Sequence, residues 1–170
     1  MNAQSSAAAA RRSPTPQDLV VWREFAETGE RLRSMLDARL QAESGLSRGD
    51  YLVLLALTEA GGAPVRSSEV ASIIGWERSR LSHHLGRMEA RGVITRHQSR
   101  ADSRGAEVAL TADGARQFRR ASAAHLRAVQ ELFLDALSPQ LLSRVRELTD
   151  ALGQHWVESG AAVPGYAASP

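Results

Sequence analysis

The sequence predicts a mainly helical domain that carries one small β-hairpin. Between residues 18 and 158, apolar side chains recur at steps of three and four residues, which is the spacing of one helix face. Two short runs rich in β-branched and apolar residues flank a polar loop between residues 93 and 110, which is typical of a hairpin. The length of 170 residues is the usual size of one domain.

Two long helical segments are expected before the centre of the chain. The first covers residues 18–46, and its apolar stripe consists of Trp22, Phe25, Leu32, Leu36 and Leu40. Ser47 and Asp50 then stand at capping-box spacing before the nearly continuous apolar run YLVLLALTEA. This run predicts a helix buried on most sides, which ends at the turn GGAP.

Two short helices follow a possible strand at Val65-Arg66. We expect Ser67 and Ser68 to cap the first helix, which stops at Gly75. The second has the buried stripe Leu81, Leu85 and Met88, and it stops at Gly92. Such a pair, joined by a tight glycine turn, is a helix-turn-helix.

A β-hairpin follows the second short helix directly. Its strands are Val93–His97 and Glu107–Leu110, on either side of the loop QSRADSRGA. A helix-turn-helix followed at once by a hairpin is a winged helix. The sequence therefore predicts a winged helix-turn-helix lobe over residues 47–111.

The rest of the chain is expected to form long helices and two tails. Thr111 is a candidate cap for a helix, and Ser138-Pro139 is a good start for the last one. The expected apolar stripes of these helices are Ala115, Phe118, Leu126, Val129 and Phe133, then Leu142, Val145, Leu148, Leu152 and Trp156. We expect long helices over 18–46 and 112–158, whose apolar surface exceeds what a small winged helix needs and so favours dimerisation, a disordered tail over 1–17 and a flexible tail over 159–170.

The charge of the chain is unevenly distributed. The formal net charge is +2, and all 21 basic residues are arginine. The block from Arg66 to Arg104 holds eight arginines against four acidic residues, which favours an anionic partner. The chain has no cysteine, which excludes disulfides, thiolate metal sites and cysteine nucleophiles. No apolar stretch approaches the roughly 18 residues of a membrane span, so we expect a cytoplasmic protein.

The second short helix carries the candidate DNA-binding residues. At 100° per residue, the face opposite its buried stripe and the flanks of that face are polar or basic. The candidates on this face and its flanks are Ser79, Arg80, Ser82, His83 and Arg87, and Arg78 at the start of the helix is a further candidate. Arginine reaches guanine or phosphate, whereas serine and histidine make shorter hydrogen bonds. The alternative is a solvated helix face that is merely basic.

The hairpin loop adds a second candidate contact. Arg96, Arg100 and Arg104 cluster around it, and an arginine at a protruding tip can enter the minor groove. We expect Gly105 to relax the backbone beside Arg104. Asp102 either orients an arginine or is an ordinary turn aspartate, and both interpretations stand.

The segment GWERSRLSHHLGRMEARGVITRHQSRADSRGAEVALTADG resembles the MarR family of bacterial transcription regulators. The specific parts are Arg80 to Arg96, Asp102-x-Arg104-Gly105, and Leu110-Thr111 running into Gly114. The likeness covers about residues 18 to 157. It implies that the helix matching Arg78 to Arg91 enters the major groove, that Arg104 enters the minor groove, and that the terminal helices form an intertwined dimer.

The resemblance also implies a function. It indicates a repressor that binds a pseudo-palindromic operator as a homodimer. Many family members release DNA when a small aromatic or anionic compound binds between the dimer arm and the lobe. Trp22, Phe25 and Tyr51 are the candidate lining residues here, although helical aromatics are more often core residues. The apolar terminal helices favour a dimer independently, and packing within one chain is the alternative.

Other functions are weighed against DNA binding. The five histidines have no metal-ligand spacing, so no metal or cofactor is expected, and His84 is interpreted as a packed histidine. No catalytic arrangement stands out, so an enzyme is not expected. The rival function is a winged-helix module that binds protein, and Arg80, His83 and Arg87 argue against it.

Overall fold

The computed structural model describes residues 13–98 and 106–161, and these ranges divide into two compact units between Ser34 and Met35. The first unit holds the beginning of helix α1 (Pro16–Ser44). Thr15 and Asp18 close the start of α1, because each backbone N–H bonds the other's side chain, at 2.8 and 3.2 Å. The expected tails lie mostly outside the described residues, but the helix already begins at Pro16, inside the predicted tail.

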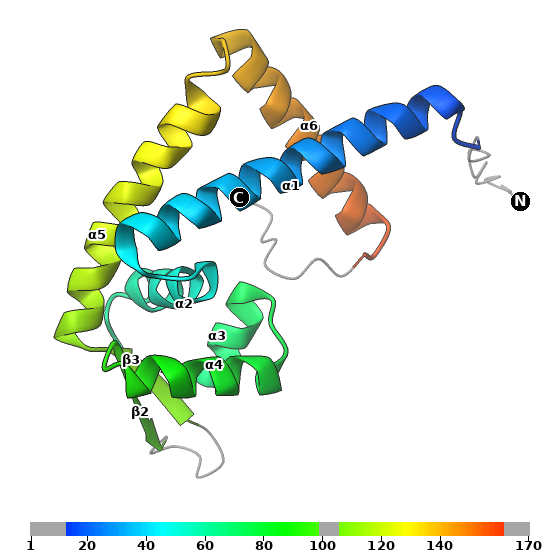
Figure 1. The fold of residues 1–170 in the computed structure, drawn as a ribbon. Helices are drawn as coiled ribbons and strands as arrows, with labels where there is room; N and C mark the ends of the chain where they lie inside the picture. Colours follow the sequence, from blue (N-terminus) through cyan, green and yellow to red (C-terminus); the bar gives the residue numbers. More distant parts are fainter. Residues whose placement is uncertain (1–12, 99–105, 162–170) are drawn as a thin grey trace, which may run out of the picture. The chain divides into compact units, whose positions relative to one another are not determined.

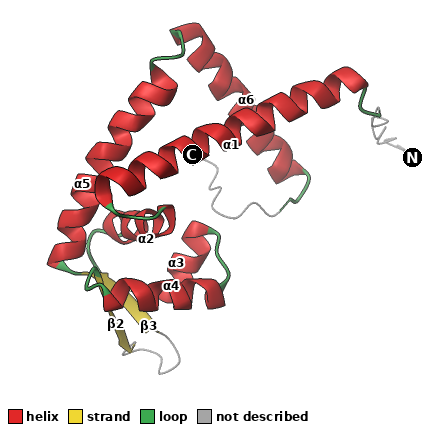
Figure 2. Ribbon diagram, in the orientation of Figure 1, coloured by secondary structure: helices red, strands yellow, loops and turns green. Residues whose placement is uncertain are grey.

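The second unit contains a winged helix. Its elements are α2 (Arg48–Glu59), β1 (Val65–Arg66), α3 (Ser67–Ile74), α4 (Arg78–Ala90), β2 (Ile94–Gln98) and β3 (Ala106–Leu110), drawn in Figures 1 and 2. The three strands form an antiparallel sheet in the order β1-β3-β2, with Val65 opposite Val108 and Ile94 opposite Leu110. The predicted fold class is confirmed, and the possible strand at Val65-Arg66 joins the hairpin as a third strand.

One hydrophobic core holds these elements together. Its buried members come from every helix and strand of the lobe, and those at most 1% exposed include Val53, Leu54, Leu57, Val70, Leu81, Leu85, Met88, Ile94 and Val108. Burying a leucine or valine side chain contributes about 1.5–3 kcal/mol. The core therefore fixes α4 and the strands of the wing relative to α2.

The helix boundaries in the lobe follow local chemistry, with one exception. The capping box on α2 is confirmed, with Ser47 N 3.0 Å from Asp50 Oδ2 and Asp50 N 3.2 Å from Ser47 Oγ. The prediction that Ser67 and Ser68 cap α3 is wrong. Arg66, paired in β1, is the N-cap without a side-chain bond, because the chain passes directly from strand to helix and leaves both serines inside the first turn. Gly75, at φ +67°, ends α3 as predicted.

Helix α5 (Ala112–Val129) begins against the base of the wing. Thr111 accepts from the N–H of Gly114 at 2.9 Å and donates to the carbonyl of Gly92 at 2.7 Å, so the predicted cap is confirmed. A Cβ on Gly114 would lie 1.9 Å from the carbonyl oxygen of Val93. Only glycine therefore permits this approach of α5 to the strand that follows α4.

The buried face of α5 differs from the predicted stripe. Leu126 was expected in that stripe, but it is 66% exposed. The buried positions are Phe118, Ala121, Ala124 and Ala128. Alanines bring α5 close to α2, whereas the larger leucine turns outward. Within the chain, Phe118 of the predicted stripe is therefore buried, whereas Leu126 lies on the surface.

The chain then passes through a π-helical turn, η1 (Gln130–Leu134), into α6 (Pro139–Glu158). Ser138 caps α6, with Pro139 in its first turn, as predicted. Gly153 is the only buried residue of α6, while Leu141, Leu148 and Val157 are exposed. In α1, Trp22 and Phe25 are also exposed. No helix within residues 13–98 and 106–161 has both the length and the apolar character needed to cross a bilayer.

Candidate DNA-binding surface

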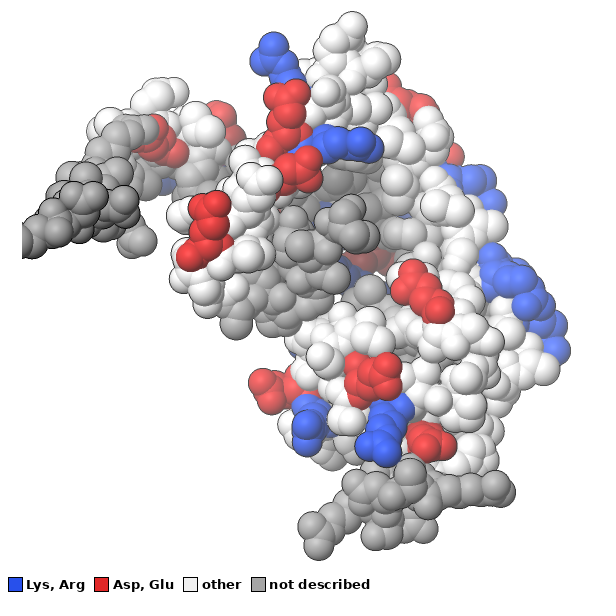
Figure 3. All heavy atoms as spheres, turned by 180° about the vertical axis from the view of Figure 1, so that it is seen from behind, with Lys and Arg blue, Asp and Glu red and all other residues white. Residues whose placement is uncertain are grey.

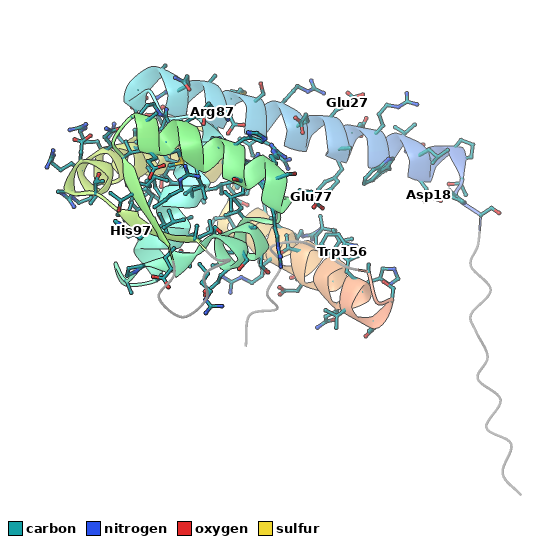
Figure 4. All side chains as sticks on the ribbon, turned by 90° about the horizontal axis from the view of Figure 1, so that it is seen from below. Asp18, Glu27, Glu77, Arg87, His97 and Trp156 are labelled. Carbon is teal, nitrogen blue, oxygen red and sulfur yellow. The ribbon has the colours of Figure 1, made fainter. Side chains whose placement is uncertain are left out.

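Helix α4 presents a polar face that the core orients. Leu81, Leu85 and Met88 are at most 1% exposed and face inward. The six DNA-binding residues predicted on this helix are all exposed: Arg78, Ser79, Arg80, Ser82, His83 and Arg87. In Figure 4, Glu77 marks the start of α4, and Arg87 lies nearer its other end. A helix with this face is suited to lie in the major groove of a duplex.

The surface charge is mixed. On the face drawn in Figure 3, arginine side chains alternate with acidic side chains rather than forming one continuous basic field. The net charge of +2 agrees with this picture.

Arg80 is positioned by an aromatic ring. Its guanidinium carbon lies 4.0 Å from the centre of the Trp76 ring, a cation–π arrangement. Trp76 also contacts His84 edge-on, with ring centres 5.2 Å apart. A Cβ on Gly49 would lie 2.7 Å from Trp76, so the absence of a side chain there makes room for the indole.

Arg96 has a different role from the predicted one. It was expected to join the arginines around the wing loop. Instead, its Nε lies 2.7 Å from Glu89 Oε2, and its backbone N–H bonds Glu89 Oε1 at 3.1 Å. The Arg96 guanidinium holds the pKa of the Glu89 carboxyl below its usual value. Arg96 therefore ties β2 to α4, and its charge is largely paired.

A buried carboxylate stands at the start of α2. The side chain of Asp50 is 3% exposed. Its oxygens accept hydrogen bonds from Arg91 and from the Ser47 hydroxyl, the latter at 2.8 Å. Burial by itself raises the pKa of Asp50, but the bonds from Arg91 and Ser47 outweigh it, and the pKa lies below its ordinary value. Asp50 is therefore ionised at neutral pH.

His84 lies between this carboxylate and the exposed face of α4. Its Nε2 is 3.0 Å from Asp50 Oδ1, a close contact rather than an aligned hydrogen bond, and its Nδ1 is 2.9 Å from Arg87 Nη2. Burial lowers the pKa of His84, and the charges of Arg87 and Arg91 lower it further against the attraction of Asp50. The imidazole is therefore neutral at pH 7. The expectation of a packed histidine is confirmed, since His84 is 8% exposed.

Several of these residues were not found by sequence reasoning. Asp50 was identified only as a helix cap, and Trp76, Glu89 and Arg91 were not singled out. Asp50 and Arg91 are 41 positions apart, so no local spacing could have paired them. Glu89 and Arg96 are seven apart across the junction of a helix and a strand, for which no simple periodicity exists.

The remaining wing residues cannot be placed in the same way. Arg100, Asp102, Arg104 and Gly105 lie outside the described residues. The strands on either side are described, and their register runs from Ile94 opposite Leu110 to Gln98 opposite Ala106.

The expected effector-lining residues fall in different units. Trp22 and Phe25 are exposed on the first part of α1. Tyr51 of α2 lies in the other unit, with its ring centre 5.4 Å from that of Phe118 and 4.9 Å from that of His125. Within the described part of the chain, His125 Nδ1 is buried without a hydrogen-bond partner.

Two cavities adjoin α4. They have volumes of about 550 and 370 Å³, and Ser47, His84 and Arg87 line both. Neither is lined by Trp22, Phe25 or Tyr51. Among residues 13–98 and 106–161, no three histidine or acidic side chains gather closely enough to hold a metal ion.

A MarR family model matches residues 44–105. The comparison with curated proteins gives no significant match. Among solved structures, the chain is similar to AbsC, a MarR family transcriptional regulator from Streptomyces coelicolor, with 30% identity and a TM-score of 0.77. That match covers 86% of this chain and 99% of AbsC.

Two further structures extend the comparison. Sco3205, a MarR family transcriptional regulator from Streptomyces coelicolor solved in complex with DNA, shares 30% identity at a TM-score of 0.76, over 84% of this chain and 93% of its own. The organohalide-sensing regulator RdhR-CbdbA1625, in its 2,4-dichlorophenol-bound form, shares the fold at 16% identity and a TM-score of 0.70, over 86% of this chain and 88% of its own.

The lobe, the polar face of α4 and these similarities agree on one assignment. The relatives are transcriptional regulators, so an enzyme class is not indicated. The chain belongs to the MarR family and is a DNA-binding transcription regulator with a winged helix.

Proposed function

We propose that the chain represses transcription as a homodimer bound to a pseudo-palindromic operator. The observation that carries the proposal is the exposed surface of α4, which has six exposed polar or basic side chains, most of them on the side away from the buried apolar stripe. Two such helices related by a two-fold axis would meet half-sites about one helical turn, or roughly 10 bp, apart.

The proposed contacts fall into two sets. On α4, Arg80, His83 and Arg87 read bases or fix the register of the helix, and Arg78, Ser79 and Ser82 support them. In the wing, Arg100 and Arg104 reach the minor groove, with Asp102 and Gly105 shaping the loop. The wing assignment rests on the sequence, since those four residues lie outside the described ranges.

The dimer is supported by apolar side chains left on the surface. In α6, Leu141, Leu148 and Val157 are 48%, 44% and 65% exposed. In α1, Trp22 and Phe25 are exposed as well. Apolar surface of this kind marks an interaction site or an aggregation liability, and a second copy of the chain would cover it. A stable monomer in sedimentation at micromolar concentration, under conditions of tight DNA binding, would contradict the dimer.

The test of DNA recognition begins by selecting bound fragments from genomic DNA. Arg80→Ala should then weaken binding to the selected operator by about 1–3 kcal/mol. It should also reduce the difference between the affinity for the operator and the affinity for random duplex DNA. Arg120→Ala is the matched control, because Arg120 is exposed on α5, outside α4 and outside the apolar side chains of α1 and α6 that support the dimer. If no fragment is preferred over random DNA, the protein-interaction module becomes the better interpretation.

A contribution from the wing is tested by salt dependence. Arg104→Ala should reduce the slope of log affinity against log salt by about one unit, because one phosphate or minor-groove charge contact is lost. It should also weaken the preference for A·T-rich flanks. If Arg104→Ala changes neither the salt slope nor the preference for A·T-rich flanks, the wing does not contact the DNA.

An effector that releases the DNA is part of the proposal. Its support is the ring cluster of Tyr51, Phe118 and His125, where the buried His125 Nδ1 lacks a partner among the described residues. A small aromatic compound with an acidic or phenolic group would satisfy that nitrogen and stack on the rings. A panel of substituted benzoates and phenols tests this. The effector proposal is supported if a compound releases DNA from the wild-type protein and Tyr51→Ala no longer binds that compound. It is contradicted if the compound still releases DNA when Tyr51, Trp22 and Phe25 are each replaced by alanine.

A further inference from the structure

Arg87 is an exposed arginine whose side chain is nevertheless anchored. It stands on the polar face of α4, and its Nη2 lies 2.9 Å from the Nδ1 atom of the buried His84. Arginine side chains at a surface ordinarily sample many rotamers. A contact to a buried ring therefore removes much of the freedom that Arg87 would otherwise lose on binding DNA.

The direction of this hydrogen bond follows from the chemistry of the two groups. A guanidinium can only donate, so Nδ1 of His84 must be the acceptor and carries no proton. In the neutral ring the proton is then on Nε2, 3.0 Å from Asp50 Oδ1. The ionised Asp50 attracts that N–H and so favours the same tautomer.

The ring itself is held on several sides. Trp76 packs edge-on against it, and a Cβ on Gly49 would come within 3.1 Å of its Cε1 atom. Asp50 is in turn fixed by Ser47 and Arg91. The acceptor atom presented to Arg87 therefore has a defined place relative to the core.

We propose that His84 is a positioning residue for DNA recognition, in which neutral Nδ1 holds the Arg87 guanidinium ready for the duplex. This inference rests on the proposed function of α4. Arg87 uses one of its five N–H donors on His84, and the structure gives it no second partner within the described residues. The other donors remain for phosphate or base. His84 acts through Arg87, not by touching DNA.

The arrangement also makes DNA binding sensitive to acid. The charged groups around His84 are Asp50 and Arg48 of α2, Arg87 and Arg91 of α4, and Arg80 stacked on Trp76. Protonation of Nδ1 removes the acceptor and places a cation against Arg87. Since burial keeps the pKa of His84 below 6.5, this loss is expected only as the pH falls below 6.5.

The first experiment measures the tautomer in the DNA-free wild-type protein. Long-range ¹H–¹⁵N correlation spectra at neutral pH should show His84 with an unprotonated Nδ1 and a protonated Nε2. The Nδ1 resonance should move in Arg87→Ala. A proton on Nδ1 would overturn the proposal, whatever the protein binds.

The second experiment uses two variants that each keep one polar atom of the ring. In His84→Asn the side-chain oxygen can take the place of Nδ1, whereas in His84→Gln the side-chain nitrogen can take the place of Nε2. We expect His84→Asn to bind the selected operator within about threefold of wild type, and His84→Gln to lose about five- to tenfold, like Arg87→Ala. Equal losses in both variants would overturn the role of the acceptor.

A double-mutant cycle separates positioning from simple structural damage. In an Arg87→Ala background, His84→Gln should change operator affinity less than twofold, because the residue through which it acts is gone. If the loss of operator affinity in the double variant equals the product of the losses in the two single variants, the proposal is overturned. Thermal unfolding of each variant checks that the variant is folded. The tautomer of His84 is measured in the wild-type protein, so that test does not depend on the folding of any variant.

The dependence of operator affinity on pH provides a measurement that a purely structural role of His84 would not change. The ratio of wild-type to His84→Asn affinity should fall as pH drops through the pKa of His84, and the contributions of His83 and His97 cancel in that ratio. A flat ratio would overturn the proposal. Failure of the proposed function would look different, since the wild-type protein would then prefer no duplex at any pH.

Discussion

The lobe and helix α6 contain similar leucines in opposite surroundings. Leu54 and Leu57 of α2 are at most 1% exposed, whereas Leu141 and Leu148 of α6 are 48% and 44% exposed. Both helices have apolar spacing that predicts a buried face. The difference shows that periodicity identifies a face to be covered but not what covers it: the core of the same chain for α2, and on our proposal a second copy for α6.

The charged clusters of the second unit differ in the same way. Asp50, His84 and Arg91 meet around a buried carboxylate at the base of the lobe. Arg39, Glu43, Arg127 and Glu131 join α1 to α5 and η1 through exposed ion pairs of 2.9–3.1 Å. The buried cluster specifies geometry, while the exposed one is screened by water and salt. The following substitutions test these two contrasts.

The largest effect is expected for Gly114→Ala. Its Cβ would overlap the carbonyl of Val93, so α5 must separate from the wing base. We expect a loss of at least about 4 kcal/mol in the free energy of unfolding, measured by urea denaturation. Gly29→Ala on α1 is the control, because no atom lies within 4 Å of its added Cβ. Gly29→Ala should be neutral or stabilising by up to about 1 kcal/mol. If both variants lose the same free energy of unfolding, the close approach at Gly114 is not the cause.

A pair of leucine truncations tests the core against α6. Leu54→Ala should lower the free energy of unfolding by about 2–5 kcal/mol, because it leaves a cavity in a fully buried site. Leu148→Ala should change the stability of the single chain by less than about 0.5 kcal/mol but weaken self-association. Denaturation and sedimentation on the same samples measure both. A large loss of fold stability with unchanged association for Leu148→Ala would contradict the assignment of this face.

Asp50→Asn tests the buried charge cluster. It removes the charge facing Arg91 and weakens the cap of α2, so we expect a loss of about 1–3 kcal/mol at pH 7. The folded pKa of Asp50 lies below its ordinary 3.8, so its stabilisation is complete above pH 3.8 and is lost as pH falls through the folded value. The free energy of unfolding, measured from pH 7 to pH 2, should therefore decrease less at acidic pH in Asp50→Asn than in the wild-type protein. An equal decrease would show that Asp50 is not ionised in the fold.

His84 contributes to a separate pH window. Its folded pKa lies below 6.5, so the unfolded chain takes up a proton first as pH falls. Stability from this group is therefore complete above about pH 6.5 and declines from there towards the folded pKa. His84→Asn should flatten that part of the profile. His97, which is exposed, gives the matched control as His97→Asn, and the same flattening there would contradict the assignment to His84.

The smallest effect is expected in the exposed ion-pair cluster. Glu43→Gln removes one ion-pair partner of Arg39, which keeps Glu131, and the carboxylate partner of Arg127; both arginines are exposed. We expect a change in unfolding midpoint at low salt that disappears at high salt, because screening replaces the lost attraction. A salt-independent change would show that Glu43 acts by packing rather than by charge.

Local chemistry in the sequence determined the elements and the face of α4. The capping box at Ser47, the stops at Gly75 and Gly92 and the cap at Thr111 were all predictable, because each depends on bonds within a few residues. The polar side of α4 was predictable because the period of a helix places Arg80 and His83 away from Leu81 and Leu85.

The tertiary structure alone decided how distant residues meet. Arg96 pairs with Glu89, Leu126 turns outward, and Asp50, His84 and Arg91 converge, although none of this follows from spacing. The physical reason is range: a helix or turn constrains neighbours up to about four residues apart, while contacts across 41 positions exist only once the core has set the place of each helix.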